Sequence, residues 1–148
     1  MRLNKVQADG VHVVGDVTYR GKCPAESMEQ MTFFNRLRKA YPETWGALAL
    51  HPRNEGQLRM GQFSSMQKVR AEGMTKGAAD IIIPGAPAFV CELKRLDHTK
   101  SRWEDGQEAY LVAAAAAGCW TCVALGADAA WEAFALWARS IASYGVRP

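Results

Sequence analysis

Residues 24–41 carry apolar side chains at the spacing of an amphipathic helix. The apolar stripe consists of Met31, Phe34, Leu37 and Tyr41. Pro24 suits a first helical turn, because the N–H that it lacks would have no helical partner there, and Pro42 cannot continue the helix. The pattern therefore predicts a long helix over Pro24–Tyr41.

Short apolar runs further along the chain are typical of buried strands. Asp80–Ile83 is rich in β-branched residues, and Ala88–Lys94 follows it after the tight turn Pro-Gly-Ala-Pro, so the two runs predict an antiparallel hairpin. Trp120–Leu125 predicts another core strand, and the run Trp45–Leu50 is interpreted as a short strand before the hairpin.

Two helices are predicted in the C-terminal part of the chain. One covers Asp105–Ala117, with Asp105 as candidate N-cap and Gly118 directly after its end, and the other begins at Asp128 and runs to about Tyr144. The first of them can connect the hairpin to the strand at 120–125 as a crossover. The predicted fold class is therefore α/β, a small mixed sheet flanked by helices, in a single domain over residues 1–148.

Three segments have weaker patterns. Residues 1–22 alternate weakly between glycines, which favours an N-terminal arm or a hairpin. Residues 53–61 are polar and contain glycine, so a loop is expected there, and Ser64–Glu72 is interpreted as a short helix that ends at Gly73.

Composition excludes some classes of protein. No apolar run approaches the roughly 18 residues that a membrane span needs, and the first residues lack the apolar centre of a secretory signal, so we expect a cytoplasmic location. The net charge of +3 permits a polyanionic partner without requiring one. The single CxxC pair, Cys119 and Cys122, lies in a predicted strand, which favours core packing over a zinc site.

The predicted hairpin carries charged side chains at positions that should be buried. Glu92 and Lys94 are two residues apart and so share one face of their strand, and Asp80 begins the neighbouring strand. Two carboxylates brought together in this way repel each other unless a divalent cation lies between them. Oxygen ligands of this kind favour Mg²⁺ or Mn²⁺ over zinc.

Two helices can add polar groups to this hairpin. Gln107 begins a core-facing stripe that continues through Tyr110 and Leu111, so its side chain can return to the sheet, although a glutamine at a helix start can also bond backbone. In the first helix, Glu26 is predicted to point closer to the core side than Glu29, whose interpretation is a favourable charge at a helix N-terminus.

In this order and spacing, the residues resemble the VRR-NUC family of the PD-(D/E)XK nuclease superfamily. The resemblance rests on Gly73-Met-Thr-Lys-Gly-Ala-Ala-Asp80, Val90-Cys-Glu-Leu-Lys-Arg95 and Gln107, with Glu26-Ser-Met-Glu-Gln30 similar to the opening motif and His51-Pro-Arg-Asn-Glu-Gly56 to a short family loop. The family's usual proline before the metal-binding aspartate is Ala79 here, which affects the turn and removes no ligand.

The resemblance implies a PD-(D/E)XK-like core and a Mg²⁺- or Mn²⁺-dependent endonuclease that hydrolyses DNA. It implies that Asp80, Glu92 and the backbone carbonyl of Leu93 bind metal, with Glu26 as a direct or water-mediated ligand. Lys94 then acts on the attacking water, and Gln107 positions Lys94 or that water. Small stand-alone members of phage and bacterial type look like homodimers that cut four-way (Holliday) junctions, so branched DNA and a homodimer are expected.

Basic and polar residues near these motifs are candidates for contacts with DNA phosphates: Lys76, Arg95, Lys100, Arg102 and Asn54. Other functions stay open at this point. They are a non-catalytic DNA-binding subunit with a degenerate nuclease fold, a sequence-specific restriction-type endonuclease, and an α/β domain in which the acids have no catalytic role.

Overall fold

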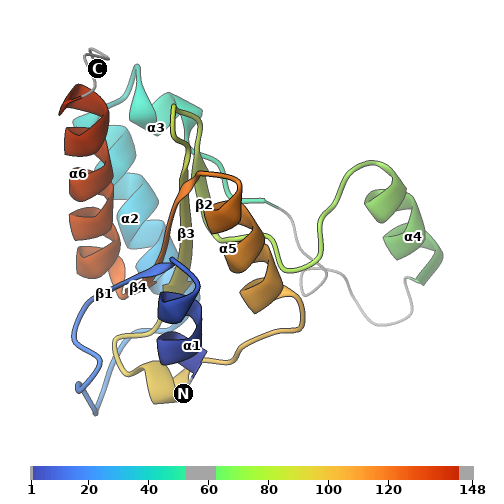
Figure 1. The fold of residues 1–148 in the computed structure, drawn as a ribbon, viewed down its shortest axis with the longest axis horizontal. Helices are drawn as coiled ribbons and strands as arrows, with labels where there is room; N and C mark the ends of the chain where they lie inside the picture. The colour runs from blue at the N-terminus through green and yellow to red at the C-terminus, as the bar shows by residue number, and fades with distance from the viewer. Residues whose placement is uncertain (1, 53–62, 144–148) are drawn as a thin grey trace.

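The computed structural model describes residues 2–52 and 63–143, and a four-stranded sheet lies at its centre (Figure 1). The strands are β1 (His12–Val14), β2 (Ile81–Ile83), β3 (Phe89–Lys94) and β4 (Trp120–Leu125). Their order is β1-β4-β3-β2, with β2 antiparallel to β3 and the other two pairs parallel. The predicted mixed sheet, its hairpin and its third core strand are confirmed.

Helices cover both faces of the sheet (Figure 1). On one face, α2 (Glu26–Ala40), α3 (Trp45–Leu48) and α6 (Ala127–Ser143) pack on Phe89, Cys91 and Leu93 of β3. On the other, α1 (Arg2–Ala8) and α5 (Gln107–Ala116) pack around Val90. The alternation of strand side chains thus gives β3 two apolar faces, and one of them also carries Glu92 and Lys94.

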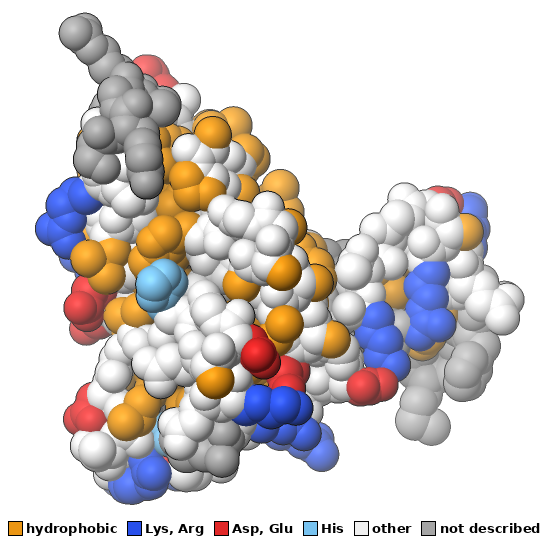
Figure 2. All heavy atoms as spheres, in the orientation of Figure 1, with side chains coloured by type: hydrophobic (Ala, Val, Ile, Leu, Met, Phe, Trp, Pro, Cys, Tyr) orange, Lys and Arg blue, Asp and Glu red, His pale blue; other side chains and the backbone are white. Residues whose placement is uncertain are grey.

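The short helix α4 (Phe63–Ala71) stands apart from the sheet and its flanking helices, as a separate lobe in Figures 1 and 2. Lys and Arg side chains gather on this lobe, and the last turn of α4 contributes Lys68 and Arg70. A 3-10 turn at His98–Lys100 connects β3 to α5. The helix expected at 64–72 is confirmed, and the loop predicted at 53–61 lies outside the described residues.

Two predicted elements were wrong. The described part of residues 1–22 is not an arm or hairpin, because α1 packs Leu3 and Val6 beneath the sheet and β1 joins β4 in parallel. The run at 45–50 forms α3, and only Leu50 makes a strand-like bridge, to Ile82. Alanine and leucine are good helix formers, and so short a run has no periodicity to oppose them.

The first helix is rotated relative to its predicted stripe. Its buried side chains are Phe33, Phe34 and Leu37, while Met31 is 52% exposed. This rotation buries Glu29, which is only 7% exposed, and its carboxylate accepts a hydrogen bond from the backbone N–H of Ala127 at the start of α6. Glu29 therefore caps α6 from a distant part of the chain, a role that the expected surface charge does not describe.

Glu29→Ala should lower the free energy of unfolding by about 1–3 kcal/mol, because it removes a charged hydrogen-bond acceptor from a buried helix N-terminus. Urea denaturation measures this change. Glu132→Ala, which removes an exposed acid of α6, is the matched control and should leave stability nearly unchanged. Equal losses in the two variants would contradict the capping role of Glu29.

Candidate active site

Strand register places Asp80 beside Glu92. In the hairpin, Ile81 pairs with Cys91, so the next step outward brings Asp80 opposite Glu92 on the same face. Asp80 also accepts a hydrogen bond from the backbone N–H of Leu93 at 2.9 Å, which fixes its carboxylate at the start of β2. The two carboxylates expected to meet therefore do meet.

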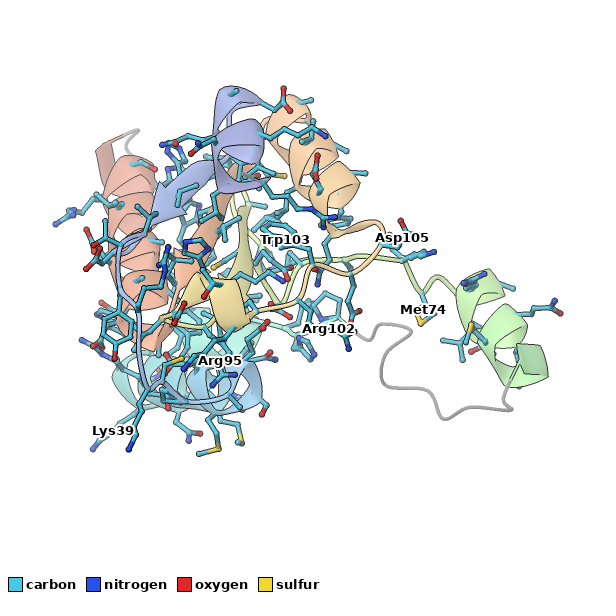
Figure 3. All side chains as sticks on the ribbon, turned by 90° about the horizontal axis from the view of Figure 1, so that it is seen from below. Lys39, Met74, Arg95, Arg102, Trp103 and Asp105 are labelled. Atoms are coloured by element: carbon cyan, nitrogen blue, oxygen red, sulfur yellow. The ribbon has the colours of Figure 1, made fainter. Side chains whose placement is uncertain are left out.

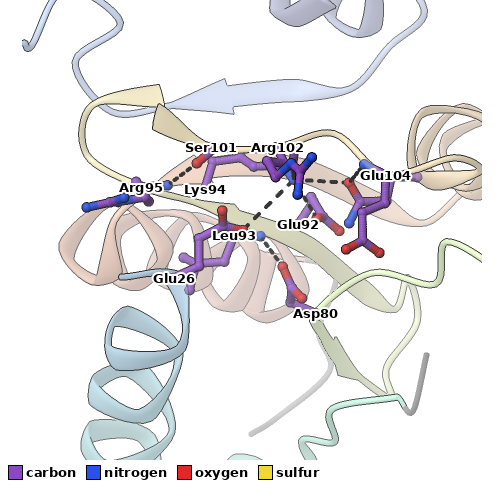
Figure 4. A network of polar contacts seen from close by, with 10 residues as sticks. Glu26, Asp80, Glu92, Leu93, Lys94, Arg95, Ser101, Arg102 and Glu104 are labelled. Atoms are coloured by element: carbon purple, nitrogen blue, oxygen red, sulfur yellow. Dashed lines mark hydrogen bonds and ion pairs between the residues drawn. The ribbon is translucent and has the colours of Figure 1, made fainter. Parts of the chain in front are cut away.

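Lys94 lies at the centre of the polar network in Figure 4. Its ammonium donates to the carbonyl of Arg102 at 2.8 Å and to the side-chain oxygen of Gln107 at 3.0 Å. It also lies 3.1 Å from a carboxylate oxygen of Glu92 and 4.0 Å from one of Glu26. The lysine is 1% exposed, so these partners hold it in one position.

Gln107 reaches this network because two backbone segments approach closely. Gly77 has a φ of +75°, and a Cβ on it would lie 2.2 Å from the carbonyl carbon of Gly106. The first turn of α5 thus rests directly on the segment before β2. The Gln107 side-chain oxygen also accepts from the N–H of Glu104 at 2.9 Å. The predicted N-cap, Asp105, is exposed and pairs with Lys76, and Gly106 occupies the cap position.

Glu26 lies at the first residue of α2, at the open side of the network (Figure 4). It lines a pocket of about 380 Å³ together with Asp80, Gln107 and basic side chains from the 95–102 segment. Glu26, Asp80, Glu92, Lys94 and Gln107 therefore come from four elements and converge on one site. Of the two helical acids, Glu26 is the one that belongs to it.

The three site carboxylates are destabilised in their charged form. Burial raises the pKa of Glu92 well above its usual range, and the neighbouring Asp80 raises it further, against the opposing effect of Lys94. Burial likewise raises the pKa of Asp80 and of Glu26. Neither oxygen of Glu92 accepts a directional hydrogen bond within the described part of the chain, in spite of the close ammonium of Lys94.

These raised pKa values predict that the folded protein becomes less stable as the pH rises. The folded protein holds the carboxyl protons more tightly than the unfolded chain, so the stabilisation is complete below about pH 4 and is lost as the pH rises through the raised values. In EDTA, the melting temperature of the wild type should therefore decrease from pH 5 to pH 8. The melting temperature of Asp80→Asn should decrease by less over the same range. A parallel decrease in both proteins would contradict the raised pKa of Asp80.

Two contacts of the site were not identified from the sequence. Nδ1 of His51 lies 2.7 Å from the carbonyl oxygen of Asp80, and because a carbonyl only accepts, this nitrogen carries the proton. The ring centre of Trp103 lies 4.6 Å from the Lys94 ammonium, a cation–π contact. In the sequence, His51 stands out only as the first residue of a loop similar to one in the family. No motif marks Trp103.

The predicted phosphate contacts differ in their availability, and two of them, Arg95 and Arg102, are labelled in Figure 3. Arg95 and Lys100 line the pocket but donate to carbonyls of the 21–24 segment. Lys76 does not line the pocket and pairs with Asp105 at 2.7 Å. Arg102 lines the pocket, and its guanidinium makes no hydrogen bond or ion pair with any residue that the structure describes. Asn54 lies outside the described residues.

Within residues 2–52 and 63–143, no three His, Cys, Asp or Glu side chains form a ready metal-binding group. Two carboxylates are nevertheless well suited to a cation, because Asp80 lies beside Glu92 and both Glu92 oxygens are buried without a hydrogen bond. Mg²⁺ is commonly bound by one or two protein carboxylates that are completed by water and substrate phosphate. The residues present thus fit a divalent cation of this kind.

The comparisons with known proteins agree with this architecture. A solved structure described as "VRR_NUC domain protein" superposes with a TM-score of 0.60, covering 80% of this chain and 89% of that chain at 18% sequence identity. No protein-family model matches the chain, and no curated protein matches it. The predicted α/β class, a small mixed sheet flanked by helices, is confirmed, and the VRR-NUC resemblance is confirmed at the level of the fold.

In the described part of the chain, every helix is too short or too polar to cross a membrane.

Proposed function

We propose that this chain is a metal-dependent endonuclease of VRR-NUC type that hydrolyses DNA phosphodiester bonds and prefers branched DNA such as a four-way junction. The observation that carries the proposal is the buried Glu92, whose oxygens lack hydrogen bonds beside Asp80 and Lys94. An acid that destabilises the fold in this way is typical of a site selected for ligand binding.

Asp80 and Glu92 would hold Mg²⁺ or Mn²⁺. Leu93 would add its carbonyl, because its N–H faces Asp80 and a strand residue directs its N–H and C=O to the same side. Successive strand residues direct these groups to opposite sides, and the carbonyl of Lys94 accordingly accepts a hydrogen bond from the N–H of Gly126 on the side of β4. When bound, the cation lowers the pKa of a coordinated water and neutralises charge on the scissile phosphate. Glu26 would contribute through water, since it lies at the open side.

Lys94 acts on the attacking water and on the phosphate in this proposal. Its ammonium is held by Gln107 and the carbonyl of Arg102, so it is fixed where it can orient the attacking water and stabilise charge that develops on the phosphate. Gln107 acts through Lys94 as a positioning residue. The expected products carry a 5′-phosphate and a 3′-hydroxyl.

A panel of end-labelled DNAs tests the function. Single-stranded, duplex, flap and four-way junction DNA are incubated with the protein in Mg²⁺ and in Mn²⁺, with Glu92→Ala as the control. We expect cleavage near the branch and none by the variant. Plasmid DNA is digested in parallel, and discrete linear fragments from it would favour a restriction-type enzyme. Binding without cleavage would favour a DNA-binding subunit.

Arg102 is proposed as a contact to a DNA phosphate. Arg102→Ala should weaken binding and reduce the slope of log K against log salt by about one, because each lost phosphate contact releases about one counterion fewer. Fluorescence anisotropy over a salt series measures the slope. Lys76→Ala, which removes a cation already paired with Asp105, is the matched control and should leave the slope unchanged.

A homodimer is proposed as the active form on four-way junctions, because symmetric cleavage needs two sites and one chain supplies one. Light scattering of the pure protein, alone and with a junction, measures the mass. A single chain per junction that still makes paired symmetric cuts would contradict this proposal.

A further inference from the structure

A second pocket adjoins the candidate active site on the other side of Asp80. It has a volume of about 490 Å³ and extends along α2. Its lining includes Gln30, Met31, Phe34, Asn35, His51 and Asp80. Asp80 lines both this pocket and the pocket around Glu26, so the two pockets adjoin at this residue.

The two pockets differ in chemistry. The pocket around Glu26 is lined by Arg95, Lys100 and Arg102 besides acids, which suits a phosphate and a cation. The α2 pocket is lined on its apolar side by Phe34 and by the exposed thioether of Met31. The side-chain amides of Gln30 and Asn35 also line it. Such a lining offers an apolar contact, mainly at the exposed Met31, and neutral hydrogen-bonding groups, which together suit a nucleobase.

Arg38 completes the pocket, and its guanidinium lies 5.1 Å from the ring centre of Phe34. A planar cation held over an aromatic ring at the rim can stack on a base or pair with the phosphate that follows it. The pocket therefore has contacts for the two parts of one nucleotide beyond the scissile phosphate.

We infer that the α2 pocket is a subsite for one unpaired nucleotide next to the scissile phosphate. This inference rests on the proposed nuclease function and narrows its substrate class. A paired and stacked base cannot leave the duplex without losing its stacking and pairing energy, whereas a base at a branch, flap or gap has already lost part of it. The subsite thus selects DNA with an unpaired base beside the cut.

Abasic substitution tests the subsite. A branched DNA is prepared with an abasic residue at each position in turn near the branch, and dissociation constants are measured by anisotropy in Ca²⁺, beside cleavage in Mn²⁺. One position should weaken binding about tenfold when its base is removed, since stacking of one base contributes about 1–3 kcal/mol. In the variant Met31→Ala/Asn35→Ala, this ratio of abasic to intact DNA should fall to nearly one.

Thr32→Ala is the matched control, because Thr32 is an exposed α2 residue that does not line the pocket. It should keep the wild-type ratio. Cleavage by the wild type with a ratio near one at every position would overturn the subsite and leave the nuclease function standing. A tenfold ratio that depends on Met31 and Asn35, without cleavage in Mn²⁺ or Mg²⁺, would support the subsite and contradict the nuclease function. Absence of DNA binding would overturn both.

Discussion

Replacing Glu92 by glutamine is expected to abolish cleavage and, in the same protein, to stabilise the metal-free fold. Cleavage should fall by at least about 10³-fold, because an amide cannot supply the charge that holds a divalent cation. Stability near neutral pH should rise, because the folded state raises the pKa of Glu92 and thus disfavours its charged form. Glutamine resembles the protonated acid in shape and charge.

Both effects can be measured on one protein sample, by initial rates in Mn²⁺ and by thermal melting in EDTA at pH 8. Glu132→Gln, which changes an exposed acid of α6, is the matched control and should alter neither quantity. A Glu92→Gln protein that cleaves at the wild-type rate would refute the ligand role. One that loses both activity and stability would show that Glu92 serves the fold.

Lys94→Met is expected to have the opposite effect on stability and a similar effect on activity. Methionine keeps most of the aliphatic side chain but leaves Glu92 and Asp80 without their buried cation, which should cost about 3–5 kcal/mol at pH 8. The loss should shrink as the pH falls toward 5, because the acids then take up protons. Cleavage should fall by about 10²–10⁴-fold, as for loss of a group that acts on the attacking water.

A double variant separates charge from packing. In Lys94→Met/Glu92→Gln, the loss of stability should be much smaller than in Lys94→Met alone, since the uncompensated carboxylate is gone. Urea denaturation of the wild type, both single variants and the double variant measures the coupling. Additive changes would contradict the buried ion pair as the cause.

The hairpin was predictable because strand parity alone decides which side chains share a face. Glu92 and Lys94 had to point away from Cys91 and Leu93, and the structure places the latter two in the core beneath α2 and α6. The position of Asp80 followed from the short turn between the strands. Gln107 was predictable for a similar reason, since a clear helical stripe at Leu111 fixed its direction.

The first helix was harder, because its apolar residues allow more than one stripe. Met31 and Tyr41 fitted the predicted spacing, yet both are exposed, and Phe33 is buried in their place. The choice depends on what the helix packs against, and α6 begins about a hundred residues later in the sequence. The same long-range contact, from Glu29 to Ala127, could not be seen in a local pattern.

The basic residues show a different limit. Lys76, Arg95 and Lys100 are near the motifs in sequence, but each has a carboxylate or backbone carbonyl as partner. Sequence distance does not show whether a cation is already paired. The contact between Lys94 and the carbonyl of Arg102 was equally hidden, because a backbone carbonyl carries no sequence signal.

The central claim, that Asp80 and Glu92 bind a catalytic divalent cation, is tested most directly by calorimetric titration of metal-free protein with Mn²⁺. We predict saturable binding that becomes tighter from pH 6 to pH 8, because the cation displaces protons from carboxyls of raised pKa. Asp80→Asn should abolish this binding. No saturable binding by the wild type, or an unchanged isotherm in Asp80→Asn, would contradict the claim.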